Sequence, residues 1–217
     1  MKILNLYACL GGNRYKWDEV AEGLEITAVE WDEELARLYQ ERFPNDTVIV
    51  ADAHQYLLEH YEEYDFIWSS PPCPTHSRAN FWASKSVDTR AKVYPDLTLY
   101  QEILFLDNWY NGKYIVENVI PYYVPLIPAK KRGRHLYWTN FNLPSDLGDR
   151  RFQISAAKQE FKGLCDFHNY DFTKYKGKQN PTKIARNLVD YEAGRTILET
   201  ALEITRKQNT NQLELEI

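Results

Sequence analysis

A cysteine at position 73 stands directly behind two prolines, in the stretch SSPPCPTHSR that follows the apolar-acidic run YDFIW. Each proline ring fixes its own φ, so the turn is stiff and the direction of Cys73 is pre-set. The thiolate form of cysteine is a strong nucleophile, and covalent catalysis is therefore the chemistry to test at this position. A lone cysteine is more often a small core residue, so the hypothesis needs support from other motifs.

Other residues that could bind a ligand or take part in a reaction occur in the same context, each at the end of an apolar run. The pair Gly11-Gly12 follows the first run, Glu30 and Asp52 close the next two, and Glu117 closes the last. Glycine lets a ligand approach the backbone, and a carboxylate accepts hydrogen bonds. Taken singly, an acid here is often a helix cap and a glycine pair is often only a turn. Their ordered recurrence is the informative feature.

The segments that must position these residues alternate between strand and helix patterns. Strands are predicted over 2–8, 25–32, 46–52, 65–70 and 112–119, and helices over 17–24, 33–43, 54–64 and 97–110. Such alternation predicts βαβ units and a doubly wound, Rossmann-like α/β fold with a parallel sheet. Ligands of these folds bind beyond the carboxyl ends of the strands. We therefore expect the residues above to meet at one edge of the sheet.

The alternation fades after Asn140 and divides the chain. Residues 1–140 are predicted to form the catalytic domain, and 141–180, rich in aromatic residues, lysines and turn formers, to be irregular or short-stranded. A last helix is predicted over about 182–206, packing back on the catalytic domain, before a frayed tail over 207–217. No internal repeat or heptad pattern is present.

Composition narrows the class of protein. The chain has 217 residues, 44% hydrophobic and 14% aromatic, which suits one well-buried domain. No apolar run approaches the roughly 20 residues that span a bilayer, and three cysteines without repeated spacing do not make a disulfide framework. We therefore expect a cytoplasmic protein.

The charges are unevenly distributed. The net charge is −5, yet residues 130–186 carry thirteen Lys/Arg against five Asp/Glu, which leaves −13 for the remainder. A basic face on an acidic body is typical of nucleic-acid-binding proteins. On charge alone, a solvated basic surface is an equal explanation.

Several motifs together resemble those of the DNA (cytosine-5) methyltransferases. The stretches LYACLGGNR, AVEWD, VADA, SSPPCPTHS, YIVENV and KKRGRHLYW follow the family order, and PTKIARNLV…GRTI is similar to the family's last motif. The specific part is PPC followed about 45 residues later by ENV. The resemblance implies S-adenosyl-L-methionine as cofactor, S-adenosyl-L-homocysteine as product, double-stranded DNA as partner and a flipped target base.

The resemblance also implies catalytic roles. Cys73 would add to cytosine C6, and Glu117 would hydrogen-bond N3 and the exocyclic amine. Arg134 and Arg132 would face O2 and the thiolate side, where charge develops.

For the cofactor, the resemblance implies that Glu30 binds the ribose hydroxyls and that Asp52 accepts from the adenine amino group. Trp31 would stack on adenine, although a core tryptophan is equally plausible. The full implied cofactor set is Tyr7, Gly11, Gly12, Glu30, Trp31, Asp52, Ala53, Pro71 and Asn187.

For nucleic acid, the implied contacts are Ser77, Arg78, Lys130, Arg150, Arg151, Lys174, Lys176 and Lys178. The variable region of about 40 residues, 141–180, is small, so a short recognition sequence of about two to four base pairs is expected. No metal spacing surrounds His76, which is interpreted as an exposed loop histidine. A monomer or weak dimer without metal or membrane attachment is expected.

Some positions depart from the family pattern. Cys9 stands where a third glycine is usual, Pro74 replaces a glutamine, and Lys130 stands where the arginine motif begins with glutamine. These differences favour a compact branch of the kind found in phage, mobile-element and restriction-modification genes. Two alternatives stay open: cytosine-5 methylation of RNA such as tRNA, and a catalytically silent DNA-binding subunit. An amino-group methyltransferase expects an aromatic residue where Cys73 stands.

Overall fold

The protein is built on one seven-stranded sheet, in a computed structural model that describes residues 1–86, 91–150, 152 and 157–204. The strand order is β3-β2-β1-β4-β5-β7-β6. The strands are β1 (Lys2–Leu6), β2 (Glu25–Glu30), β3 (Thr47–Val50), β4 (Phe66–Ser69), β5 (Lys113–Val119), β6 (Lys130–Arg132) and β7 (His135–Thr139). The first five are parallel, and β7 and β6 add an antiparallel edge. The Rossmann-like prediction and its five strands are confirmed.

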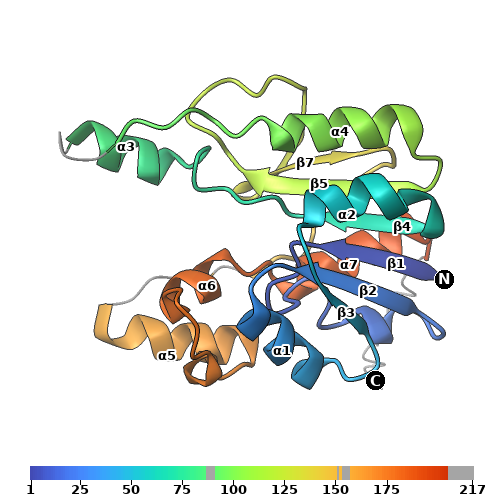
Figure 1. Ribbon diagram of the computed structural model, residues 1–217, viewed down its shortest axis with the longest axis horizontal. Helices are drawn as coiled ribbons and strands as arrows, with labels where there is room; N and C mark the ends of the chain where they lie inside the picture. Colours follow the sequence, from blue (N-terminus) through green and yellow to red (C-terminus); the bar gives the residue numbers. More distant parts are fainter. Residues whose placement is uncertain (87–90, 151, 153–156, 205–217) are drawn as a thin grey trace, which may run out of the picture.

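Helices cover both faces of the sheet (Figure 1). Helices α2 (Ala53–His60) and α4 (Thr98–Trp109) pack on one face; α1 (Glu33–Arg42), the 3-10 turn η1 (Trp17–Glu19) and α7 (Tyr191–Ala201) pack on the other. Alternate residues of a strand pack against the helices on opposite faces of the sheet. In β4, for example, Ile67 faces α4, whereas Phe66 and Trp68 face η1 and α7. This two-sided burial explains why the central strands are continuous apolar runs.

Two helix predictions were wrong in extent. Over 17–24 only the 3-10 turn η1 forms, because Trp17 is fully buried and its indole nitrogen donates to the Gly194 carbonyl at 3.1 Å. The predicted last helix is two helices, α6 (Pro181–Asn187) and α7, which are separated at Leu188–Asp190. The side chains of Asn180 and Asp190 cap their N-termini. Residues 205–217, including the predicted tail, lie outside the described residues.

The region after Asn140 is more helical than expected. It contains α5 (Ala157–His168), the 3-10 turn η3 (Phe172–Lys174) and α6. Their apolar residues form a cluster with Leu10 and with Leu35 and Leu38 of α1. The predicted short strands are absent from the described residues of 141–180. A further helix, α3 (Arg78–Ser86), occupies what the sequence indicated as a polar loop.

The strand order reverses direction between β1 and β4. The chain from β1 continues toward β2 and that from β4 toward β5, so the loops that follow these two neighbouring strands diverge. This is the switch point at which open α/β sheets bind ligands. In the part of the chain that the structure describes, no helix combines the length and the apolar character that a membrane span needs.

Candidate active site

A cavity of about 430 Å³ lies at the switch point, beyond the carboxyl ends of β1, β2, β4 and β5. It brings together most of the residues singled out in the sequence: Tyr7, Gly12, Glu30, Trp31, Pro71, Cys73, Glu117, Arg134 and Asn187. A neighbouring pocket of about 480 Å³ shares Tyr7 and Trp31 and adds Asp52 and Ala53. The expectation that these segments meet at one sheet edge is therefore met for these residues.

Cys73 is half-buried in the cavity wall on a tight turn. Its carbonyl oxygen accepts hydrogen bonds from the backbone N–H groups of His76 and Ser77, both at 3.0 Å. Burial raises the pKa of the Cys73 thiol, and the nearby Glu117 carboxylate raises it further, whereas Lys183 and Arg134 act in the opposite direction. The net shift of the Cys73 pKa is upward, so the surroundings of this thiol disfavour its thiolate form.

Glu117 and Asn118 lie near the end of β5, and their side chains have different partners. Glu117 is buried, lines the cavity, and has its Oε1 3.5 Å from Nε2 of His135 on the adjacent strand β7. The side-chain amide of Asn118 donates to the Pro71 carbonyl at 2.9 Å. That bond joins the end of β5 to the turn that carries Cys73. The acid and the thiol are thus held on one rigid frame.

The basic residues of the segment 130–134, before β7, differ in position: one lines the cavity and others contact only the surrounding backbone. Arg134 lines the cavity and donates to the Arg186 carbonyl at 3.1 Å. Arg132 does not line it; its guanidinium donates to the carbonyls of Leu143 and Pro144. The amine of Lys130 donates to the Phe141 carbonyl at 2.6 Å. Arg132 and Lys130 are therefore found fixing the chain after β7, away from the cavity.

The two carboxylates at the ends of β2 and β3 also have structural duties. Glu30 accepts from the backbone N–H groups of Cys9 at 2.8 Å and Asp32 at 2.9 Å, and burial raises its pKa. Asp52 caps α2 by accepting from the Gln55 N–H at 2.9 Å. Each carboxylate oxygen has more than one lone pair, so a capping acid on a pocket wall can still accept from a ligand.

Trp31 is not a core residue. Its side chain is 74% exposed, and it lines both pockets beside Glu30. The core interpretation is therefore wrong, and an indole face is available at the pocket wall.

The glycine turn after β1 is required by packing within the protein. A Cβ on Gly12 would lie 2.4 Å from the Val189 carbonyl, and Gly11 has a φ of +64° with the ring of Phe43 2.5 Å from its Cβ position. Gly11 does not line the cavity. Cys9 has a φ of +48°, in the left-handed region that glycine adopts most easily. This conformation gives a physical reason why glycine would suit position 9 better.

A buried acid, Glu102 of α4, was missed from the sequence. It is fully buried and accepts from the hydroxyls of Tyr7 and Ser69, while His54 lies 3.2 Å away. Burial, together with the Glu102 charge, raises the pKa of Tyr7. These bonds hold the Tyr7 ring in the cavity wall. A glutamate in the middle of an apolar helix pattern was the available signal.

In addition to the bond between Asn118 and Pro71, backbone contacts join the turn that carries Cys73 to the segment after β5. Ser77 forms an isolated bridge with Pro121, and the Tyr122 N–H donates to the His76 carbonyl at 3.1 Å. His76 is 1% exposed, and its Nδ1 is 2.5 Å from the Tyr123 hydroxyl. The interpretation of His76 as an exposed loop residue is therefore wrong. Within the described residues, no group of three or more His, Cys, Asp or Glu could hold a metal ion.

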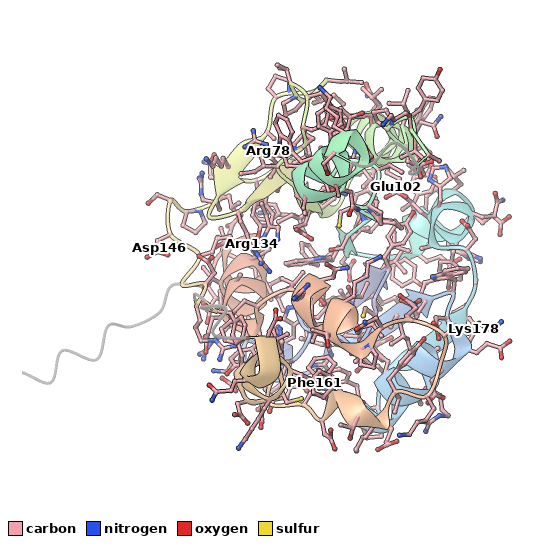
Figure 2. The ribbon with its side chains drawn as sticks, turned by 90° about the vertical axis from the view of Figure 1, so that its left-hand side faces the viewer. Arg78, Glu102, Arg134, Asp146, Phe161 and Lys178 are labelled. Carbon is pink, nitrogen blue, oxygen red and sulfur yellow. The ribbon has the colours of Figure 1, made fainter. Side chains whose placement is uncertain are left out.

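The other basic residues named for nucleic acid fall in different places. Arg150 pairs with Asp190 at 3.0 Å and lies over the rings of Phe167 and Tyr191. Lys174 pairs with Glu41 at 2.8 Å. The exposed residues Lys176 and Lys178 lie beyond η3, and Figure 2 shows Lys178 across the molecule from Arg134. Arg78 is exposed on the same side as Arg134 (Figure 2). Arg151 lies outside the described residues.

Comparison with known proteins agrees with this geometry. The family model described as C-5 cytosine-specific DNA methylase matches residues 1–119, more than half of the chain. The chain belongs to this family. Membership of this family supports an S-adenosylmethionine-dependent methyltransferase, as the motifs indicated. A comparison with curated proteins finds no match.

Solved structures similar to this chain include two proteins of low sequence identity. A methyltransferase from Entamoeba histolytica, EhMeth, is 9% identical, with 95% of this chain and 99% of that chain covered and a TM-score of 0.52. A DNMT2 mutant from Spodoptera frugiperda is 27% identical over 54% of this chain and 35% of that chain, with a TM-score of 0.37. The match to the latter spans about a third of its length. The similarity to EhMeth supports the fold.

Proposed function

We propose that the protein methylates C5 of cytosine in DNA through a transient bond between Cys73 and C6 of the ring. The observation that carries the proposal is the convergence of Cys73, Glu117 and Arg134 on one cavity. Two of these groups act electrostatically on the third. The Glu117 charge raises the pKa of the Cys73 thiol, and the Arg134 charge lowers it. A nucleophile, a ring-binding acid and a cation beside the same cavity fit addition to a pyrimidine.

The chemistry needs a nucleophile because C5 of cytosine is a weak nucleophile itself. The Cys73 thiolate adds to C6, and the electron pair of the C5=C6 bond becomes available at C5. Glu117 hydrogen-bonds N3 and the exocyclic amine, and Arg134 stabilises charge at O2. After methyl transfer, loss of the C5 proton re-forms the double bond and expels the thiolate. The raised pKa of Cys73 requires a proton to leave the thiol before it attacks.

The pocket walls fit S-adenosyl-L-methionine, which supplies an electrophilic methyl group when bound. Glu30 offers carboxylate oxygens for ribose hydroxyls, Asp52 offers one for the adenine amino group, and the exposed indole of Trp31 offers a stacking face. Tyr7, Pro71 and Asn187 line the same cavity as Cys73 and Glu30. A cytosine buried in a duplex is out of reach of Cys73, so the target base must leave the stack.

Replacing Asp52 with alanine is expected to weaken cofactor binding by about 1–3 kcal/mol, the usual cost of a lost hydrogen bond to a charged group. Isothermal titration with S-adenosyl-L-homocysteine measures this change. Because Asp52 also caps α2, Asp52→Asn is the matched control: asparagine retains a capping oxygen but loses the charge. An unchanged dissociation constant in both variants removes Asp52 from the cofactor site.

The decisive experiment for the proposed function is transfer of a labelled methyl group to DNA and to tRNA, followed by nucleoside analysis. 5-Methylcytosine in DNA is the expected product. Label that appears only in tRNA favours the RNA alternative, and label in neither, with nucleic-acid binding intact, favours a silent subunit. Bisulfite sequencing of a host genome after expression then gives the recognition sequence.

A further inference from the structure

Helix α3 starts five residues after Cys73 and is almost unsupported by the core. None of its nine residues is buried. It extends away from the sheet on the side where the parallel strands end, instead of covering a sheet face (Figure 1). A helix this short is marginal in isolation, so contacts at its N-terminus must hold it in place.

Those contacts tie α3 to both catalytic segments. Arg78 Nε donates to the Pro121 carbonyl at 3.1 Å, next to the bridge between Ser77 and Pro121. The Phe81 ring stacks on that of Tyr122, with centroids 4.0 Å apart and planes inclined by 3°. Because Pro121 and Tyr122 follow β5, the first turn of α3 is fixed relative to Glu117 as well as to Cys73.

The outer face of α3 combines an aromatic ring with cations. Arg78, Trp82 and Lys85 are spaced i, i+4 and i+7, which places them on one helix face, and all three are exposed. The Trp82 side chain is 64% exposed, and the Lys85 amine lies 5.7 Å from its ring centroid. Residues 74–86 and 91–95, as described, carry Arg78, Lys85 and Lys92 but no acid. We call Arg78, Trp82 and Lys85 the α3 platform.

We propose that the α3 platform binds an unpaired stretch of the DNA strand that carries the target cytosine, an inference that rests on the proposed function. Trp82 stacks on a base of that stretch, while Arg78 and Lys85 contact its phosphates. Aromatic faces interleaved with cations are the recognition elements for single-stranded nucleic acid. A paired duplex offers phosphates to a helix but no free base face to Trp82. The Phe81 ring also lies beside Trp82, with centroids 5.7 Å apart, but the residues at i−4 and i+3 of Trp82 are the cations Arg78 and Lys85, which favour a polyanionic partner over an apolar protein surface.

The test is the dissociation constant for three labelled DNAs of one sequence, by fluorescence anisotropy. They are a single strand, a duplex with a mismatched bubble around the target cytosine, and a fully paired duplex. Trp82→Ala is expected to weaken binding of the first two by roughly 5- to 150-fold, the range for loss of one stacked base, with a much smaller effect on the paired duplex. Trp82→Phe, which retains a ring, should recover most of the affinity.

Trp109 provides the matched control. It is 67% exposed at the end of α4, next to the start of β5 and therefore at the opposite edge of the sheet from Cys73. Trp109→Ala should leave all three dissociation constants unchanged. In addition, Lys85→Gln should reduce the slope of log K against log salt by about 0.7 for the single strand, as expected when one phosphate contact is lost.

Equal losses in Trp82→Ala and Trp109→Ala, or equal losses on paired and unpaired DNA, overturn the proposal. So does tighter binding of RNA of the same sequence than of DNA. If Trp82→Ala fails to fold, the two other variants test the proposal: Trp82→Phe through its affinity for unpaired DNA, and Lys85→Gln through the slope of log K against log salt. These are binding measurements, so they stand apart from the proposed function, which fails only if the unaltered protein transfers no methyl group to DNA.

Discussion

Replacing Cys73 with serine is expected to abolish methyl transfer, lowering the rate by at least about 10⁴-fold, as when other covalent enzymes lose their nucleophile. A serine hydroxyl has the size and place of the thiol, but it is a far weaker nucleophile without an adjacent base. The acid whose charge acts on the Cys73 thiol is Glu117, and its proposed role is to bind the ring. The measurement is a single-turnover rate with labelled cofactor and cytosine-containing DNA.

Binding should survive this substitution. The half-buried Cys73 is held by its own backbone, whose carbonyl accepts from His76 and Ser77, so the turn does not depend on the sulfur. Dissociation constants for DNA and cofactor are therefore expected to stay within a few-fold of the original. Cys165→Ser is the matched control, because Cys165 lies on α5 away from the cavity. Substantial turnover by Cys73→Ser contradicts the covalent route.

Replacing Glu117 with glutamine is expected to affect two rates in opposite directions. Methyl transfer should fall by about 10²- to 10⁴-fold, because the ring loses the group that we propose holds N3 and supplies a proton. Alkylation of Cys73 by iodoacetamide should become faster at pH 8, because the Glu117 charge raises the pKa of the thiol and its removal increases the thiolate fraction. Quantifying the Cys73 peptide by mass spectrometry separates it from Cys9 and Cys165.

The pH profile gives the sign of this effect. With a raised pKa, the Cys73 thiol is protonated at neutral pH, so alkylation rises as the pH increases through the alkaline range. In Glu117→Gln the same curve should move to lower pH. Arg134→Gln, which removes a charge that lowers this pKa, should move it to higher pH. Curves that coincide for all three proteins would mean that these side chains do not act on the thiol.

The sequence predicted the central sheet because its strands are unambiguous. Runs such as those of β4 and β5 are apolar on both faces. A reactive side chain lies at or just beyond the carboxyl end of each, Cys73 after β4 and Glu117 near the end of β5. Parallel strands place such ends at one edge. The switch point between β1 and β4 then brings them into one cavity, as the sequence led us to expect.

Other features depend on tertiary contacts that no local pattern encodes. The helix predicted over 17–24 is replaced by a turn because Trp17 is needed in the core. Arg132 and Arg134 are two residues apart in one motif, yet only Arg134 lines the cavity. The chain turns between them at Gly133, whose φ is +52°, and the carbonyls of Leu143 and Pro144 hold the Arg132 guanidinium. The burial of His76 likewise arises from a partner, Tyr123, that is distant in sequence.

The most direct test uses DNA in which the target cytosine carries fluorine at C5. Addition of the thiol and methyl transfer can proceed, but C5 then has no proton to lose, so the ring stays bonded to the protein. The account predicts a denaturation-resistant protein–DNA adduct that forms only with cofactor present and maps to the Cys73 peptide. If ordinary cytosine in the same sequence is methylated while the fluorinated DNA gives no adduct, or an adduct at another residue, the central claim is wrong.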